Sequence, residues 1–138
     1  MVTDIHITVT TGNGRQCASS GSRWEPIMGY SRAVRSGNVI AVTGTVGINA
    51  DGTYAPSLAE QTRRSLAIIG AALEALGGRL EHVLRTRMFV TDVSQWEEVA
   101  AVHGQVFGDI RPATTIVEVA RLIDADARIE IEADALVP

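Results

Sequence analysis

The stretch of sequence that most constrains the fold runs from Arg111 to Ala135 and reads RPATTIVEVARLIDADARIEIEADA. Its second half alternates between apolar and acidic residues, which is the pattern of a half-buried β-strand. The apolar positions are Ile129, Ile131, Ala133 and Ala135, and the acidic ones are Glu130, Glu132 and Asp134. Three carboxylates on one strand face repel one another unless a cation or water lies opposite. We therefore expect this face to form a binding site or an interface.

The first half of the stretch predicts another strand, separated from the last one by a turn at 122–127 that carries two Asp residues. One face of this strand would carry Thr115, Val117 and Val119, and the other Thr114, Ile116 and Glu118. We expect the face with Thr114 to lie on the same side of the sheet as the acidic row.

The rest of the chain predicts four more strands and two helices. The strands are expected at 3–10, 30–35, 38–46 and 82–91, and the helices at 57–76 and 94–107. Ser57 and Glu60, and likewise Ser94 and Glu97, have the spacing of a capping box at a helix start. Residues 11–29 are rich in Gly and Ser and are interpreted as a loop that packs back over the domain.

This order of elements predicts a single α+β domain over residues 1–138, with a mixed sheet and two helices on one face. The other face would stay open. It would carry Arg85, Arg87 and Phe89 together with Thr114, Ile116, Glu118 and the acidic row. Because arginine and carboxylate rows of this kind commonly meet across subunits, we expect a homo-oligomer with pockets between its copies.

Composition excludes several classes of function. The net charge is −4 and all 12 basic residues are arginine, so nucleic acid is not an expected partner and lysine Schiff-base chemistry is excluded. No apolar run is long enough for a membrane span and no signal peptide is recognisable, so we expect a cytoplasmic protein. His6, His82, His103 and the single Cys17 show no metal-ligand spacing, and no nucleotide motif occurs, so neither a metal nor a cofactor is expected.

Residue types alone leave the chemistry of the acidic strand open. Its carboxylates are either interface ion pairs, or one of them, shielded at a subunit junction, holds a hydrolytic water or moves a proton. Tyr30, taken alone, is equally compatible with simple packing. Residue types therefore do not decide between interface ion pairing and catalysis on this strand.

Three blocks of the sequence resemble the Rid family of YjgF-like reactive intermediate deaminases. They are GYSRAVRSGNVIAVTGTVG, QTRRSLAIIGAALEALGGRLEHVLRTRMFVTDVSQWEEV and RPATTIVEVARLIDADARIEIEADA. The resemblance implies a chorismate-mutase-like fold and a homotrimer in which the sheets form a central barrel. It also implies three clefts between subunits that receive a small metabolite.

The resemblance also assigns roles to residues of this chain. A tyrosine lining the pocket corresponds to Tyr30, a strand glycine to Gly44, a backbone contact to Ile116, and the water-positioning glutamate to Glu130. The arginine that grips the substrate carboxylate is replaced by Thr114, which places the chain in a branch lacking that arginine. A threonine offers one neutral hydrogen bond instead of a charged, bidentate one. Our hypothesis is that Arg87 or Arg32 supplies the missing cation.

The resemblance implies three functions. The favoured one is a cofactor-independent hydrolase or deaminase of small imines, enamines or related metabolites, in which Glu130 is the catalytic acid or base. The alternative is a non-catalytic homotrimer that binds a small metabolite or a protein. Ribonuclease or translation inhibition, a label carried by some relatives, is least favoured because the chain is acidic and lacks lysine.

Overall fold

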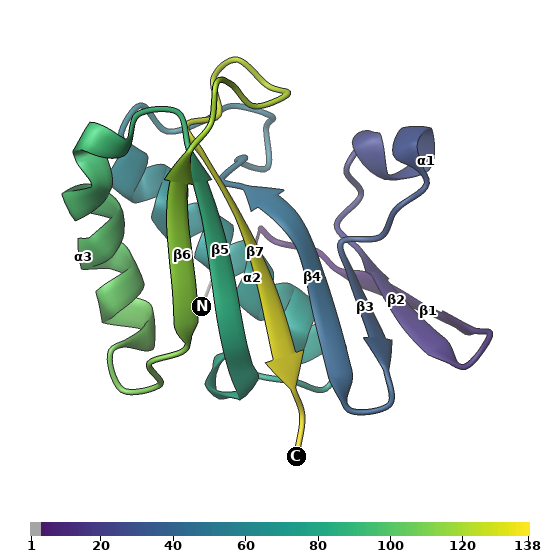
Figure 1. Cartoon of the computed structure of the whole chain (residues 1–138). Helices are drawn as coiled ribbons and strands as arrows, with labels where there is room; N and C mark the ends of the chain where they lie inside the picture. The colour runs from purple at the N-terminus through teal and green to yellow at the C-terminus, as the bar shows by residue number, and fades with distance from the viewer. Residues whose placement is uncertain (1–3) are drawn as a thin grey trace.

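The computed structural model describes residues 4–138 and contains one seven-stranded sheet in the order β1-β2-β3-β4-β7-β5-β6 (Figure 1). The strands are β1 Thr8–Gly12, β2 Arg15–Ser19, β3 Ala33–Ser36, β4 Val39–Val46, β5 Val83–Val90, β6 Ala113–Glu118 and β7 Ile129–Leu136. All neighbouring strands pair antiparallel except β5 and β6, which are parallel. The sheet is therefore mixed, as predicted, and β7 is central to it.

Two long helices lie on one side of this sheet, as predicted. They are α2 Leu58–Ala75 behind the strands and α3 Trp96–Phe107 beside the β6 edge (Figure 1). The shorter helices are α1 Trp24–Met28, η1 Leu80–His82 and η2 Val93–Gln95. Among the described residues no helix is both long and apolar enough to cross a membrane.

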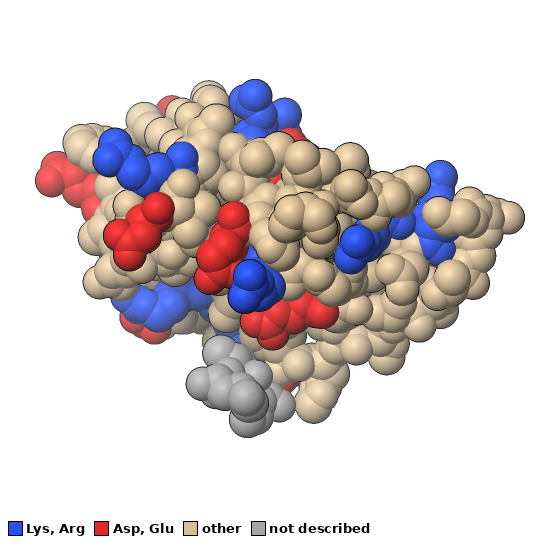
Figure 2. All heavy atoms as spheres, turned by 90° about the horizontal axis from the view of Figure 1, so that it is seen from below, with Lys and Arg blue, Asp and Glu red and all other residues tan. Residues whose placement is uncertain are grey.

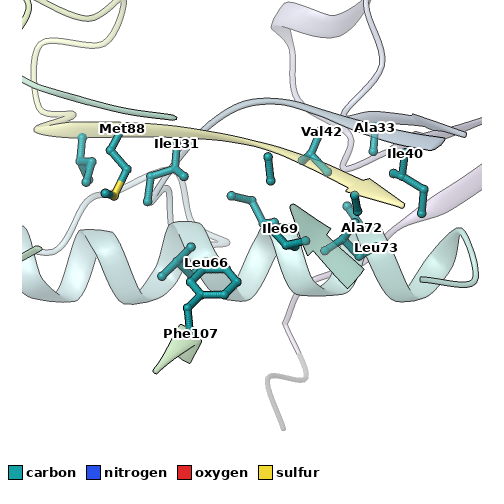
Figure 3. Packing of buried hydrophobic residues seen from close by; sticks show 14 of the residues in the cluster. Ala33, Ile40, Val42, Leu66, Ile69, Ala72, Leu73, Met88, Phe107 and Ile131 are labelled. Atoms are coloured by element: carbon teal, nitrogen blue, oxygen red, sulfur yellow. The ribbon is translucent and has the colours of Figure 1, made fainter. Parts of the chain in front are cut away.

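The hydrophobic core fills the space between α2 and the sheet. Ile69 and Leu73 of α2 are fully buried and point at the strands above them (Figure 3). Ile131 of β7 is fully buried as well, and it points down toward the helix. Burying an aliphatic side chain of this size contributes about 1.5–3 kcal/mol. The apolar face predicted for β7 is therefore what fixes the sheet to α2.

One predicted helix cap is confirmed and the other is wrong. The Ser57 hydroxyl accepts a hydrogen bond of 3.1 Å from the amide of Glu60 and caps α2. Ser94 does not cap α3, because a 3₁₀ turn precedes that helix and the carboxylate of Asp92 accepts from the Ser94 amide at 3.1 Å. The Ser94 hydroxyl donates to the same Asp92 carboxylate at 2.6 Å and therefore does not accept from an amide of α3.

The prediction that residues 11–29 form a loop is wrong for most of that segment. The segment contains the second half of a β-hairpin, formed by β1 and β2, and then α1. Asn13 and Gly14 turn the chain with φ values of 52° and 75°, which is the Asn-Gly geometry of a tight hairpin. The predicted strand at 3–10 begins outside the described residues and is observed from Thr8.

The face predicted for Thr114, Ile116 and Glu118 is also wrong. In β6 it is Thr115 and Val117 that pair with Arg87 and Phe89 of β5 and share their open face. The other three side chains point toward the helices: Thr114 bonds to Thr86, Ile116 packs against the core, and Glu118 accepts from the Val93 amide. The alternation of side chains in β6 is as predicted, but the two sets lie on the opposite faces of the sheet. Both faces of this edge strand are partly exposed and mixed in polarity, so the sequence pattern does not indicate which face lies toward the helices.

A cation lies opposite the acidic row of β7, and it belongs to the same chain, whereas the sequence analysis expected such rows to meet between subunits. Arg87 Nη1 lies 3.2 Å from a carboxylate oxygen of Glu132 and 3.0 Å from one of Asp134. Arginines and carboxylates also alternate over the surface seen from below, with no continuous basic area on it (Figure 2). The row on β7 is therefore partly neutralised within one chain.

Candidate functional site

A cleft of about 880 Å³ opens where β3 and β4 meet the end of β7 and the segment before α1. Tyr30, Arg32, Gly44 and Glu130 all line it. These residues come from three separate parts of the sequence, and the antiparallel pairing of β3 with β4 and of β4 with β7 brings them together. Three of the residues predicted for the site, Tyr30, Gly44 and Glu130, therefore share one cavity.

Arg32 is the buried centre of this cleft. It is 6% exposed, and its guanidinium donates to the Gly44 carbonyl at 2.8 Å and to the Tyr30 hydroxyl at 3.2 Å. Further donations reach Thr45 Oγ1 at 3.2 Å and Ser20 Oγ at 3.3 Å. All these partners are uncharged oxygens, and among the described residues no carboxylate forms an ion pair with Arg32. The cleft therefore holds a buried positive charge whose counterion is not fixed by the chain.

Gly44 lies directly against the carboxyl group of Glu130. The register between β4 and β7 shifts between Val42 and Thr45, so the pairing is interrupted where Gly44 sits. A β-carbon built on Gly44 would lie 2.8 Å from Glu130 Cδ and 2.9 Å from Oε2. Only glycine leaves the carboxyl in this position.

The Glu130 carboxyl is half-buried, and its pKa is raised. The main cause is desolvation by burial, and the negative charge of Glu132 adds to it, while the Arg32 cation opposes both. A raised pKa makes the Glu130 carboxylate a stronger base than an ordinary glutamate, so it accepts a proton more readily. This is the property required of a group that activates water.

One wall of the cleft, at Ser20 and Ser22, is supported from behind by a carboxylate that the sequence analysis did not identify. Glu25 of α1 is 7% exposed, and its carboxylate accepts from the amides of Ser20 and Ser22 at 3.2 Å each. The Ser20 hydroxyl also donates to Glu25 at 3.0 Å and accepts from Arg32. The contact chain from Glu25 through Ser20 to Arg32 holds the segment before α1 against the site.

Tyr54 and Asp124 form a second contact at the cleft. The Tyr54 hydroxyl donates to the Asp124 carboxylate at 2.6 Å, and burial together with this carboxylate raises the Tyr54 pKa. Arg23 lies 3.6 Å from the same carboxylate. The turn predicted at 122–127 is thereby joined to two other loops beside the cavity.

The structure does not bring the remaining predicted site residues into this cleft. Arg87 is occupied by Glu132 and Asp134 and does not line the cavity. Thr114 and Ile116 belong to β6, which is separated from β7 by β5. Within one chain the cleft therefore lacks the two β6 residues, and of the two proposed cations it contains only Arg32.

The described part of the chain shows no cluster of side chains that could bind a metal ion. Over residues 4–138 no three His, Cys, Asp or Glu side chains gather closely enough to hold a metal ion. The groups available to a ligand in the cleft are a carboxyl, a guanidinium, hydroxyls and backbone amides.

The fold and the cleft together define a small α+β domain with a carboxyl and an arginine beside a glycine bulge, and known proteins share its fold. The family model described as Endoribonuclease L-PSP matches residues 20–137. A Mycobacterium tuberculosis member of the YjgF/YER057c/UK114 family superposes with a TM-score of 0.83 and 49% identity, covering 89% of this chain and 99% of that one.

Two further relatives come from other organisms. A 2-iminobutanoate/2-iminopropanoate deaminase of Escherichia coli K12 is 35% identical over 111 residues, which are 78% of this chain and 86% of the relative. A RutC family protein of Pyrococcus horikoshii is 34% identical over 113 residues, 80% of this chain and 89% of the relative. The chain belongs to the YjgF/RutC family, also called the Rid family, and has its fold.

Proposed function

We propose that this protein is a cofactor-independent hydrolase that deaminates a small imine or enamine in the cleft around Glu130. The observation that carries the proposal is the close approach of Gly44 to a carboxyl of raised pKa beside a buried arginine. The naming of a 35% identical relative as an imine deaminase supports the same class of reaction.

In this reaction water adds to the imine carbon and the C=N bond becomes a C–N single bond. Glu130, as a carboxylate, accepts a proton from the attacking water. The same group, now protonated, donates to the nitrogen, which gives a carbinolamine with one hydroxyl and one amino group on the carbon. Glu130 then accepts the hydroxyl proton and passes it to the amino group, so that a C=O bond forms, the C–N bond breaks and ammonia leaves. No electron acceptor or metal is required for this balance.

Arg32 is the residue we assign to the negative charge of the substrate. Its guanidinium is buried in the cleft and makes hydrogen bonds only to uncharged groups within the chain. Hydrogen bonds to Ser20, Gly44, Thr45 and Tyr30 use four of its five N–H donors, so one donor on Nη2 and the positive charge remain for a substrate carboxylate. This contact would compensate for the threonine at position 114. Arg87 is less suited, because Glu132 and Asp134 already neutralise it.

The complete site would be formed between copies of the chain in a homotrimer. The open sheet face carries Arg87, Phe89 and Val117, which is a mixed apolar and charged surface suited to a subunit interface. A neighbouring copy would bring its β6 edge, with Thr114 and Ile116, to the cleft of the first.

The test is hydrolysis of 2-iminobutanoate generated in the assay by an amino-acid dehydratase. Formation of 2-oxobutanoate and ammonia should exceed the uncatalysed rate, and an Arg32→Gln variant should raise KM more than it lowers kcat. A rate equal to the uncatalysed one would contradict the deaminase function.

The alternative is a trimer that binds a metabolite without turnover, and the threonine at position 114 favours it. In that case 2-oxobutanoate, or another small carboxylate, would bind in calorimetry while the imine is not hydrolysed. Glu130→Gln would then leave the binding affinity nearly unchanged. The two functions therefore differ in turnover and in their dependence on Glu130.

A further inference from the structure

A hydrogen-bonded chain of three side chains leads from helix α3 to the edge strand β6. His103 Nε2 lies 2.9 Å from Thr86 Oγ1, and Thr86 Oγ1 lies 2.7 Å from Thr114 Oγ1. Thr86 is fully buried, whereas Thr114 is exposed at the sheet edge. The three hydrogen-bonded side chains therefore connect a half-buried imidazole with a hydroxyl on the surface.

The local structure keeps this geometry in place. Thr86 and Thr114 are register partners in the parallel pair β5 and β6, and both point toward the helices. The His103 ring packs against Phe107 with 4.7 Å between the ring centres. Thr86 is β-branched and has few allowed rotamers, so its hydroxyl is poorly able to turn elsewhere.

Each threonine hydroxyl has a single proton, so the state of His103 sets the direction of the whole chain. When Nε2 carries no proton, Thr86 donates to it and accepts from Thr114, whose proton then points inward. When Nε2 carries a proton, in the imidazolium and in the neutral Nε2–H tautomer alike, Nε2 donates to Thr86 and Thr86 donates to Thr114. The Thr114 proton is then free to point outward.

We propose that His103, acting through Thr86, positions the Thr114 hydroxyl, and that a proton on His103 Nε2 makes Thr114 a donor toward a carbonyl or carboxylate oxygen of the ligand. Thr114 is then a specificity residue, and His103 and Thr86 are positioning residues. The ligand part of this inference rests on the proposed function, since Thr114 reaches a cleft only through a neighbouring copy. The hydrogen bonds that join His103, Thr86 and Thr114 all lie within one copy of the protein.

No charged neighbour is resolved as shifting the His103 pKa, so we expect its protonation to respond to pH and to the hydrogen bonds with Thr86 and Thr114. Burial lowers the His103 pKa, and it is the one cause resolved, with no charged group contributing. The charged residues on the packed elements α2, α3, β5 and β6 are Glu60, Arg63, Arg64, Glu74, Glu97, Glu98, Arg85, Arg87 and Glu118. A ligand oxygen that accepts from Thr114 should favour the protonated state and so raise the His103 pKa.

The test is to measure the His103 pKa by NMR, with the His103→Gln variant assigning its signal among the three histidines. In the ligand-free protein with His103 protonated, the Thr86 hydroxyl donates to Thr114, and Thr114→Val removes this acceptor. It should therefore lower the His103 pKa by about 0.5 or more. Thr115→Val, a neighbouring change on the opposite face, should leave it at the wild-type value. An unchanged pKa in Thr114→Val would overturn the inference.

The ligand part is tested with 2-oxobutanoate as the probe. Saturation with this carboxylate should raise the His103 pKa in the wild type, and Thr86→Val should abolish that increase. Binding that leaves the His103 pKa unchanged overturns the role in ligand recognition. Complete absence of binding contradicts the proposed function together with this role, whereas the ligand-free measurement still decides whether the three residues act as one chain.

Discussion

The β-carbon position of Gly44 lies 2.8 Å from Cδ of Glu130, closer than any real side chain can approach. Gly44 and Glu130 belong to β4 and β7, and the register shift between these strands creates the contact. The glycine is thus required by the glutamate and not by an unusual backbone angle, since its φ is not positive. This pair of residues defines the candidate site.

Gly44→Ala should displace the Glu130 carboxyl and destabilise the protein by about 1–3 kcal/mol, the usual cost of overpacking. Urea denaturation measures the change. In a Glu130→Ala background the same substitution should cost clearly less, because its clashing partner is gone. Equal costs in the two backgrounds would show that the two residues do not interact.

The raised pKa of Glu130 predicts a pH dependence of stability. The folded state binds the Glu130 proton more tightly than the unfolded state, so this carboxyl destabilises the protein increasingly as pH rises from the ordinary value of 4.5 through the raised value. Glu130→Gln should therefore be more stable than the wild type at neutral pH, and the difference should vanish below about pH 4. Denaturation curves at several pH values give the comparison. A constant difference would contradict the raised pKa.

Two glycines outside the cleft should respond in opposite ways to alanine. A β-carbon on Gly47 would lie 2.2 Å from the Gln61 carbonyl oxygen in α2, whereas one on Gly104 in α3 meets nothing within 4 Å. Gly47→Ala should prevent stable folding or lower the melting temperature strongly. Gly104→Ala should stabilise α3 by up to about 1 kcal/mol, because alanine favours the helix. Thermal unfolding of both variants tests the packing of α2 against β4.

The open sheet face predicts that the wild type sediments as three chains. Val117 is 41% exposed on that face, and Val9 is 39% exposed on the outer strand β1. Val117→Asp should give single chains at micromolar concentration, because it places a charge in the proposed interface, and Val9→Asp should leave the assembly intact. A wild-type mass of one chain in sedimentation equilibrium would refute the shared cleft.

The sequence allowed the fold class, the order from β3 to β7, the Ser57 cap and the convergence of Tyr30, Gly44 and Glu130 to be predicted. These features depend on strong local signals, namely strict alternation in β7 and helical spacing in α2. The family motif supplied the roles of the three residues. The ion pairs of Arg87 with Glu132 and Asp134 within one chain were not predicted, because charge alone does not indicate whether oppositely charged rows meet inside a chain or between chains.

The wrong predictions concern segments in which the side-chain pattern of the sequence does not match the register or pairing of the strands. Strict alternation along β5 would put Leu84 on the same face as the buried Met88, but Leu84 is 57% exposed because the β5–β7 register shifts between Val83 and Arg85. The hairpin of β1 and β2 is nearly all polar, so only the Asn13-Gly14 turn signalled it. The contacts of Arg32 and His103 depend on distant strands and helices, and no sequence spacing encodes them.

The catalytic rate of Glu130→Gln relative to the wild type on 2-iminobutanoate tests the account most directly, with Glu74→Gln on the exposed part of α2 as the matched control. Loss of a positioned acid–base group should lower kcat about 10²–10⁴-fold, while the Glu74 variant keeps the wild-type rate. Equal rates for wild type and Glu130→Gln would contradict the proposed role of the cleft.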